Sequence, residues 1–302
     1  QIISRPLDPS TGFTETSINA GTIRNQGFEI GLNLTPVRVG GFDWTIRNNF
    51  TLNRSKVLEL PEGSKEILVS GFSDLGNFAI EGMPFNVIQG TYVKRNENGD
   101  LLVNGNGDWV ISDDIKVIGD PNPDFMLSVI NDFSYKSLSL SVMIDYVHGG
   151  DMLSYTASSL IGRGVAKDLE IVNPELSVIL PGVSEETGLP NDIPMPASGW
   201  GFGNNIIGGA ASDRAIYDAT RIRLRMVSLN YNLPSSIFGN SFIKGATVAV
   251  NGNNIWFRAI NTPKSAKVDA DRTAFGTGNG AGFDFLGGPS ASRYGATLKL
   301  DF

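Results

Sequence analysis

The segment from Ser292 to Phe302, SRYGATLKLDF, alternates between apolar and polar residues up to its last position. Its apolar positions are Tyr294, Ala296, Leu298, Leu300 and Phe302, and small, polar or charged residues lie between them. Successive side chains of a β-strand point to opposite faces of the sheet. This period of two therefore predicts a strand with one apolar face and one polar face.

The same alternation recurs in six earlier segments, so the chain is expected to form about seven strands and an all-β fold. These segments are residues 25–36, 41–55, 124–135, 138–147, 220–234 and 245–257. In TRIRLRMVSLNYNLP (220–234) the apolar set changes phase after Met226, which predicts a β-bulge. Helical character is weak and confined to residues 155–180.

The lengths of the strands and of their connections favour a membrane barrel. Strands of about 10–14 residues exceed the usual five or six, whereas about 9–11 tilted residues cross a bilayer core. Short connections near residues 37–41, 135–137 and 234–245 alternate with long ones at 57–122, 150–217 and 259–290. Short periplasmic turns and long outer loops are typical of an up-and-down β-barrel in the bacterial outer membrane.

Seven strands do not close such a barrel, because an open edge in lipid leaves backbone groups unpaired. We therefore expect residues 1–302 to be the C-terminal portion of one transmembrane barrel domain, with the remaining strands N-terminal to Gln1 or in another chain. Phe302 is then expected in the inner aromatic girdle. The terminal aromatic strand also resembles the signal that barrel-assembly machinery recognises.

Charged residues are predicted to line the interior of the barrel. Arg221, Arg223 and Arg225 share one face of a strand, and Arg47 and Asp145 occupy polar positions of two others. Each arginine would cost roughly 2–4 kcal/mol at the lipid-facing midplane, so a lumen-facing position is expected. The alternative is a soluble β-sandwich in which these arginines are simply solvated.

Composition excludes several function classes. The chain has no cysteine and one histidine, His148, so thiolate catalysis and histidine-based metal clusters are not expected. A net charge of −7 argues against nucleic-acid binding. Neither a nucleophile elbow nor a phosphate loop stands out, and the chain does not resemble an enzyme.

Several blocks, in order along the chain, resemble a known family. NQGFEIGLNLTPV, GMPFNVIQGTYV, VIGDPNPDF, RIRLRMVSLNYNLP, VNGNNIWF and YGATLKLDF are similar to the C-terminal third of SusC/RagA-like TonB-dependent transporters of Bacteroidota. The resemblance implies a 22-stranded barrel to which this chain contributes about the last seven strands. It also implies an N-terminal plug, energy coupling through TonB, a SusD-like lipoprotein lid, and import of glycans or oligopeptides across the outer membrane.

The sequence is also compatible with two other functions. The same barrel could be a structural subunit of a larger outer-membrane assembly, or the chain could be a cell-surface β-sandwich adhesin. Lipid and lipopolysaccharide are the remaining partners expected of a barrel in this membrane.

Aromatic side chains in the long loops are candidates for contact with a substrate or partner. They are Tyr92, Trp109, Trp200 and Phe202. Aromatic rings can stack on sugars or pack against peptides. The alternative is that each ring anchors its own loop.

The segment NGNGDWVISDD contains a weak calcium-binding pattern. Asn104, Asn106 and Asp108 have the spacing of the first ligands of a calcium loop, but the expected glycine is Trp109 and the final glutamate is missing. The alternative is a β-hairpin, because Asn98-Gly99 in the preceding RNENGDLLV is a strong tight-turn signal. No other cofactor is expected.

Overall fold

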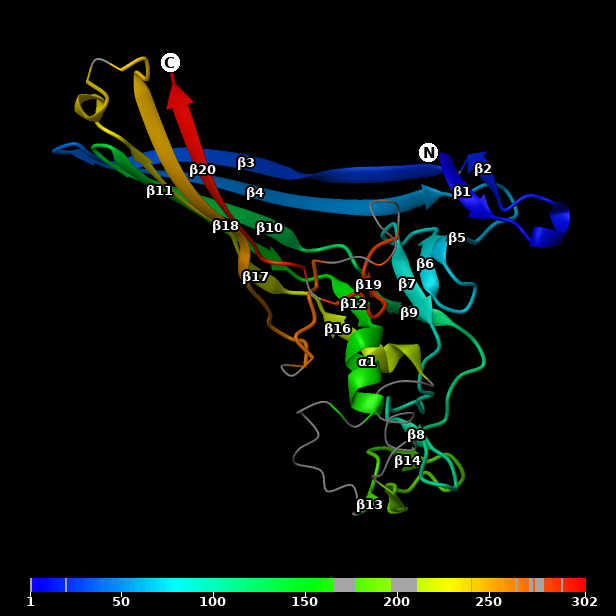
Figure 1. Ribbon diagram of the computed structural model, residues 1–302. Coiled ribbons are helices and arrows are strands. Elements are labelled where there is room, and N and C mark those ends of the chain that lie inside the picture. The colour runs from blue at the N-terminus through cyan, green and yellow to red at the C-terminus, as the bar shows by residue number, and fades with distance from the viewer. Residues whose placement is uncertain are drawn as a thin grey trace.

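The computed structural model describes residues 2–19, 21–163, 165, 177–196, 211–239, 241–263, 266–271, 274, 280–288 and 290–302. Its main feature is a seven-stranded sheet in the order β20-β18-β17-β11-β10-β4-β3. Every pair of neighbours in this sheet is antiparallel. Figure 1 shows these long strands side by side, with the loop elements gathered at one end.

The seven strands are those that the alternation predicted, although their lengths differ. They are β3 (Thr22–Val39), β4 (Phe42–Glu59), β10 (Phe125–Tyr135), β11 (Leu138–His148), β17 (Arg221–Asn232), β18 (Gly245–Ala259) and β20 (Arg293–Asp301). β3 and β4 have 18 residues each, longer than expected, because they continue past the ends of the neighbouring strands. The all-β expectation is confirmed: the sheets are mostly antiparallel, and the described residues contain one short α-helix.

Short turns join the long strands at one end of the sheet. β3 and β4 are connected by Gly40 and Gly41, with φ of 59° and 83°, the conformation that a tight two-residue hairpin requires. Lys136, with φ of 53°, turns the chain between β10 and β11. The connection from β17 to β18 contains the 3₁₀ turn η5 (Ser235–Ile237).

Two irregularities set the register. The pairing of β3 with β4 shifts between Leu34 and Val37, around Pro36, which has no N–H to donate to the ladder. The predicted bulge in β17 lies at Arg225, because Leu224 pairs with Ile144 and Met226 with Met143. Met226 therefore lies on the polar face rather than in the apolar set expected from the sequence.

The long connections fold into smaller elements. They contain β5 (Glu66–Gly71), β6 (Gly76–Ile80), β7 (Val87–Gly90), β8 (Leu102–Val103), β9 (Lys116–Gly119), β12 (Asp151–Ser154), α1 (Tyr155–Gly162), β13 (Ser177–Val178), β14 (Val183–Ser184), β15 (Met195–Pro196), η4 (Ser212–Ala215), β16 (Ile216–Asp218) and β19 (Phe283–Asp284). A separate hairpin of β1 (Ile2–Pro6) and β2 (Glu15–Asn19), with η1 (Pro9–Thr11) between them, precedes β3. Serine 154 caps α1 by accepting a hydrogen bond from the Ala157 amide at 3.1 Å.

All three long connections share one hydrophobic core. Ile88 comes from the first connection, Leu153 and Ala215 from the second, and Phe283 from the third. β12 also pairs with β16 and, in parallel, with β19, which joins the second connection to the third. The loops therefore form one packed body beside the sheet ends.

The sheet has one apolar face that remains largely uncovered. Residues in register across all seven strands form a continuous apolar row: Val39, Phe42, Tyr135, Leu138, Tyr231, Val248 and Leu298. Six of these seven are exposed, and Phe28 on the same sheet is 70% exposed. A sandwich would bury such a face against a second sheet. Among the described residues, no helix is long and apolar enough to cross a membrane.

Candidate functional site

The opposite face of the sheet is polar, and several of its charged residues are paired across strands. Arg47 of β4 donates to Asp132 of β10 through Nη2 at 2.6 Å and Nε at 3.0 Å. The other oxygen of Asp132 accepts a hydrogen bond from Ser141 of β11 at 2.7 Å. Arg38 pairs with Asp43 at 2.5 Å near the turn end of the same face. Cross-strand pairing of this kind compensates the charges of these residues on one wall of the sheet.

A shallow hollow of about 200 Å³ opens beside these pairs. Its polar lining consists of Asp43, Thr45, Asp132, Ser134, Ser139, Ser141 and Asn230. Hydroxyl and carboxylate groups from three neighbouring strands, and the amide of Asn230 from a fourth, therefore surround a space that faces away from the apolar surface. Such a surface can exchange hydrogen bonds with water or with a polar occupant.

The three arginines of β17 lie together on this polar face. Asp145 of β11 is in register with Arg223 and accepts a hydrogen bond from Arg225 Nε at 2.5 Å. The bulge places Arg225 on the side of the sheet where Arg223 lies, so that both reach the carboxylate of Asp271. Asp145 also accepts from Ser128 of β10 at 2.6 Å.

Two aspartates from the connection between β18 and β20 complete the arginine cluster. Asp269 pairs with Arg223, and both side chains are almost fully buried, at 1% and 3% exposed. Asp271 lies 3.2 Å from Arg221, 3.6 Å from Arg223 Nε and 3.0 Å from Arg225. Three guanidinium groups thus face three carboxylates, which makes the cluster electrically balanced.

Electrostatics hold Asp271 in its charged form. Burial by itself raises the pKa of this carboxyl, but the neighbouring Arg221, Arg225 and Arg223 more than offset that effect, so the pKa lies below its ordinary value. Asp271 therefore keeps its ion pairs with the arginines at neutral pH.

The loop that carries these aspartates is fixed at a second point. Ser290 donates its amide to Asp269 Oδ2 at 3.0 Å, and its hydroxyl hydrogen-bonds to the same oxygen.

The sequence pattern identified the three arginines of this cluster but missed both aspartates. The available signal was the Asp-x-Asp spacing in KVDADR, which matches the spacing of the arginines on β17.

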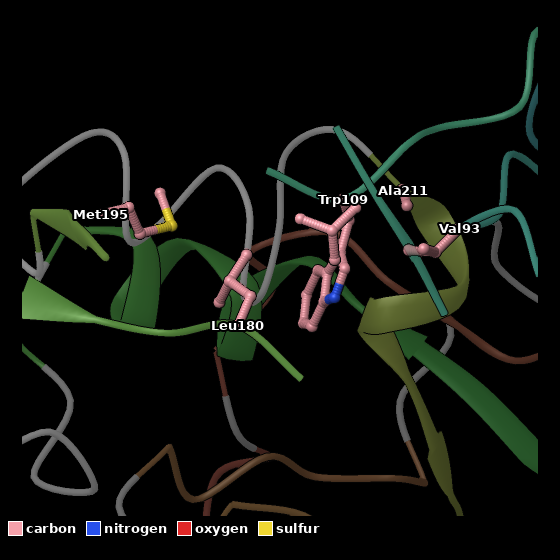
Figure 2. Packing of buried hydrophobic residues seen from close by; sticks show 6 residues of the cluster. Val93, Trp109, Leu180, Met195 and Ala211 are labelled. Carbon is pink, nitrogen blue, oxygen red and sulfur yellow. The ribbon is translucent and has the colours of Figure 1, made fainter. Parts of the chain in front are cut away.

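The aromatic candidates in the loops divide into three groups. Trp109 is 5% exposed and packs in a core with Val93, Leu180 and Ala211. Figure 2 shows its indole between Leu180 on one side and Val93 and Ala211 on the other. Its Nε1 donates to the Pro181 carbonyl at 2.9 Å, so the anchoring alternative describes this residue.

Tyr92 is half-buried, with Lys116 Nζ 3.8 Å from the centre of its ring. One face of this ring is therefore already taken by a cation. Trp200 and Phe202 lie outside the described residues, and their contact roles stay predictions.

The Asn-rich segment forms two successive tight turns. Asn96 Oδ1 accepts from the amides of Asn98 and Asp100 at 3.0 and 2.9 Å. Asn104 Oδ1 does the same for Asn106 and Asp108 at 2.9 and 3.1 Å. The hairpin expected around Asn98 is confirmed by the pairing of Arg95 with Leu101.

The calcium interpretation of Asn104, Asn106 and Asp108 stays a prediction. In the structure the Asn104 side chain is engaged as a turn-forming acceptor, a role that needs no ion. Within the described ranges, no group of three or more Asp, Glu or His side chains has an arrangement suited to a metal.

Phe302 lies at the turn end of the sheet. Its ring stacks on Phe242, from the connection between β17 and β18, with 5.6 Å between centroids and 4° between planes. The two rings are 66% and 75% exposed. An exposed aromatic pair at this rim fits the interfacial girdle expected for Phe302.

Comparisons with known proteins agree with this architecture. No model of a known protein family matches the chain. TonB-dependent receptor P3 of Formosa agariphila is 27% identical over 281 residues, covering 84% of this chain and 26% of the receptor. TonB-dependent receptor P26 of the same organism is 28% identical over 284 residues, covering 84% and 27%. The chain thus spans about a quarter of the length of the curated relatives it matches.

Solved structures give the same result for the fold. The structure of the RagAB peptide transporter matches all of this chain and 32% of its own chain, with a TM-score of 0.63 and 19% identity. The RagAB peptide importer in the "open-open" state matches all of this chain and 31% of its own, with a TM-score of 0.61. The resemblance to SusC/RagA-like TonB-dependent transporters is confirmed, and the named relatives are receptors and transporters.

Proposed function

We propose that this chain is the C-terminal section of the barrel of a TonB-dependent outer-membrane importer. The observation that carries the proposal is the seven-stranded sheet with opposite faces, one apolar and exposed, the other lined by paired charges. A strand ladder with lipid on one side and water on the other needs this division. The likeness to TonB-dependent receptors supports the same role.

The two edges of the sheet indicate where the rest of the barrel joins. β3 and β20 are the edge strands, and β3 exposes apolar residues along most of its length. In a bilayer each unpaired backbone group costs several kcal/mol, so both edges must pair with further strands. We propose that this section supplies seven strands of a 22-stranded barrel, and that a plug domain fills its interior.

The arginine–aspartate cluster and the hydroxyl-lined hollow then face the lumen. Because the ion pairs are balanced, the wall is polar but has no strong electrostatic potential of one sign. Such a wall suits a barrel interior that holds a plug and lets a solute pass. The packed loop body would lie outside the membrane, where a SusD-like lipoprotein could cover it. The proposed cargo belongs to the glycan or oligopeptide class.

The test uses the complete protein in its native outer membrane. Labelled oligopeptides and oligosaccharides are offered to cells that carry the wild-type protein, to cells that lack it, and to wild-type cells treated with an uncoupler. Import requires uptake that depends on both the protein and the proton-motive force. Co-purification with a lipoprotein at equal stoichiometry would support the lid.

A structural subunit would give a different result. Uptake would be the same with and without the protein, while other outer-membrane proteins would remain bound to it in detergent. Recovery of the complete protein in the soluble fraction would contradict the membrane assignment itself.

A further inference from the structure

A charged residue of β18 lies on the apolar face of the sheet. The row in register near its loop end consists of Ile30, Phe50, Leu127, Tyr146, Ile222 and Arg258. The first five are apolar or aromatic, and the sixth is a fully charged guanidinium. Two residues before Arg258, on the same face of β18, Trp256 is 50% exposed.

The position of Arg258 along β18 corresponds to the edge of a bilayer core. It lies ten residues beyond Val248, which belongs to the apolar row at the turn end. At about 3.3 Å per residue and a tilt of about 35–45°, this separation gives a height of roughly 23–27 Å. The apolar band of an outer-membrane barrel is about 25 Å tall. Arg258 therefore lies at headgroup level, and Trp256 just below it.

A cavity of about 440 Å³ opens beside these two side chains. Its lining includes Trp256, Arg258, Thr262, Lys267 and Ser292. Lys267 and Arg258 are both exposed, and neither forms an ion pair with a carboxylate of the described residues. Two uncompensated cations around one cavity favour an anionic ligand.

The shape of the site is maintained by its surroundings. β20 pairs with β18 only as far as Asn253, and β18 continues to Ala259 without a further strand partner on that side among the described residues. Ser292 closes the lower end by donating its hydroxyl to the Asn254 carbonyl at 2.7 Å. Lys267 has a left-handed backbone, φ 46°, and is followed by Val268, which is 3% exposed and anchors the loop.

We propose that this cavity binds the phosphate-bearing headgroup of a membrane lipid. Arg258 offers a planar fork that matches a phosphate, Lys267 adds a second positive charge, and Trp256 packs against the upper part of the acyl region. A phosphate would also remove the cost of an unpaired charge on the lipid-facing surface. This inference rests on the proposed function, since it requires the apolar face to contact lipid.

The experiment measures retained lipid on the complete protein extracted from the outer membrane in mild detergent. Native mass spectrometry compares wild type with the double variant Arg258→Gln/Lys267→Gln and with Arg258→Lys. The matched control is Lys136→Gln/Lys244→Gln, which removes two exposed lysines at the turn end. Released lipids are identified, and each delipidated protein is titrated with vesicles of an anionic phospholipid, vesicles of phosphatidylcholine, or inorganic phosphate.

We expect wild type to retain at least one phosphate-bearing lipid that the double variant loses, with about tenfold weaker rebinding. The control should match wild type, and Arg258→Lys should keep part of the binding. Equal lipid retention in wild type and the double variant would overturn the inference. The same equal retention is expected if a strand of the remaining barrel fills the cavity. Binding of inorganic phosphate without lipid retention would contradict it as well. A protein that never enters the membrane fraction would instead overturn the proposed function.

Discussion

Removing the buried carboxylate of Asp269 should release the connection between β18 and β20 from the sheet. In the variant Asp269→Ala, Arg223 keeps its charge at 3% exposure but loses its buried partner. Breaking a buried pair from one side costs about 3–5 kcal/mol, because the remaining charge stays desolvated. Ser290 also loses its acceptor. The equilibrium constant for opening of the loop should therefore rise at least about 10²-fold.

Hydrogen exchange of the complete protein in detergent measures this opening. The amide of Ala274 is a suitable probe, because it donates to the Phe283 carbonyl at 2.9 Å and takes no part in the ion pair. The protection of the Ala274 amide against hydrogen exchange should fall in Asp269→Ala. The matched control is Asp43→Ala, which breaks the pair with Arg38, whose side chain is 78% exposed. Such a surface pair is worth about 0–1 kcal/mol, so the probe should be unchanged.

A second variant separates charge from packing. In Arg223→Met/Asp269→Leu both charges are absent, so no desolvated ion remains and protection of Ala274 should recover toward wild type. The reasoning is refuted if Asp269→Ala leaves the exchange rate of Ala274 within about threefold of wild type. It is equally refuted if the exposed control has the same effect as the buried variant.

Three other predictions follow from single residues. The pKa of Asp271 lies below its ordinary 3.8, so its contribution to loop stability is complete above that pH and is lost as the pH falls through the lower folded value. The protection factor of the Ala274 amide, which removes the intrinsic pH dependence of exchange, should thus be constant from neutral pH down to about 5 and fall below about 4. Gly27→Ala should disrupt the pairing of β3 and β4, since a Cβ there would lie 1.9 Å from the Leu52 carbonyl oxygen, whereas Gly31→Ala, with its nearest atom at 3.7 Å, should be tolerated. Folded barrel yield of the two variants gives the comparison, and equal yields would contradict the steric argument. Phe302→Ala should lower the amount of assembled protein in the outer membrane without lowering synthesis, as measured by membrane fractionation; an unchanged membrane level would argue against the terminal ring as an assembly signal.

Local sequence patterns were sufficient to predict the seven long strands, their order of connection and the division of their faces. Alternation with a period of two is a local property, and each of these strands pairs with neighbours through short turns or across a loop that returns to the same sheet. For the same reason the arginines of β17 could be assigned to the polar face. The bulge was also predicted, but its position was one residue in error, because only the pairing with β11 shows that Arg225 is the extra residue.

The tertiary structure alone decided what the long loops do. Trp109 has no periodic context, so its sequence could not distinguish a ligand-facing ring from the core residue that it is. Asp269 lies 46 positions from Arg223, in a segment without regular alternation, and its Asp-x-Asp spacing does not by itself indicate which strand it contacts. The same holds for the cavity beside Arg258, which exists because β20 ends where β18 continues. Strand patterns arise from neighbouring residues along the chain, whereas these contacts depend on how separate loops return to the sheet.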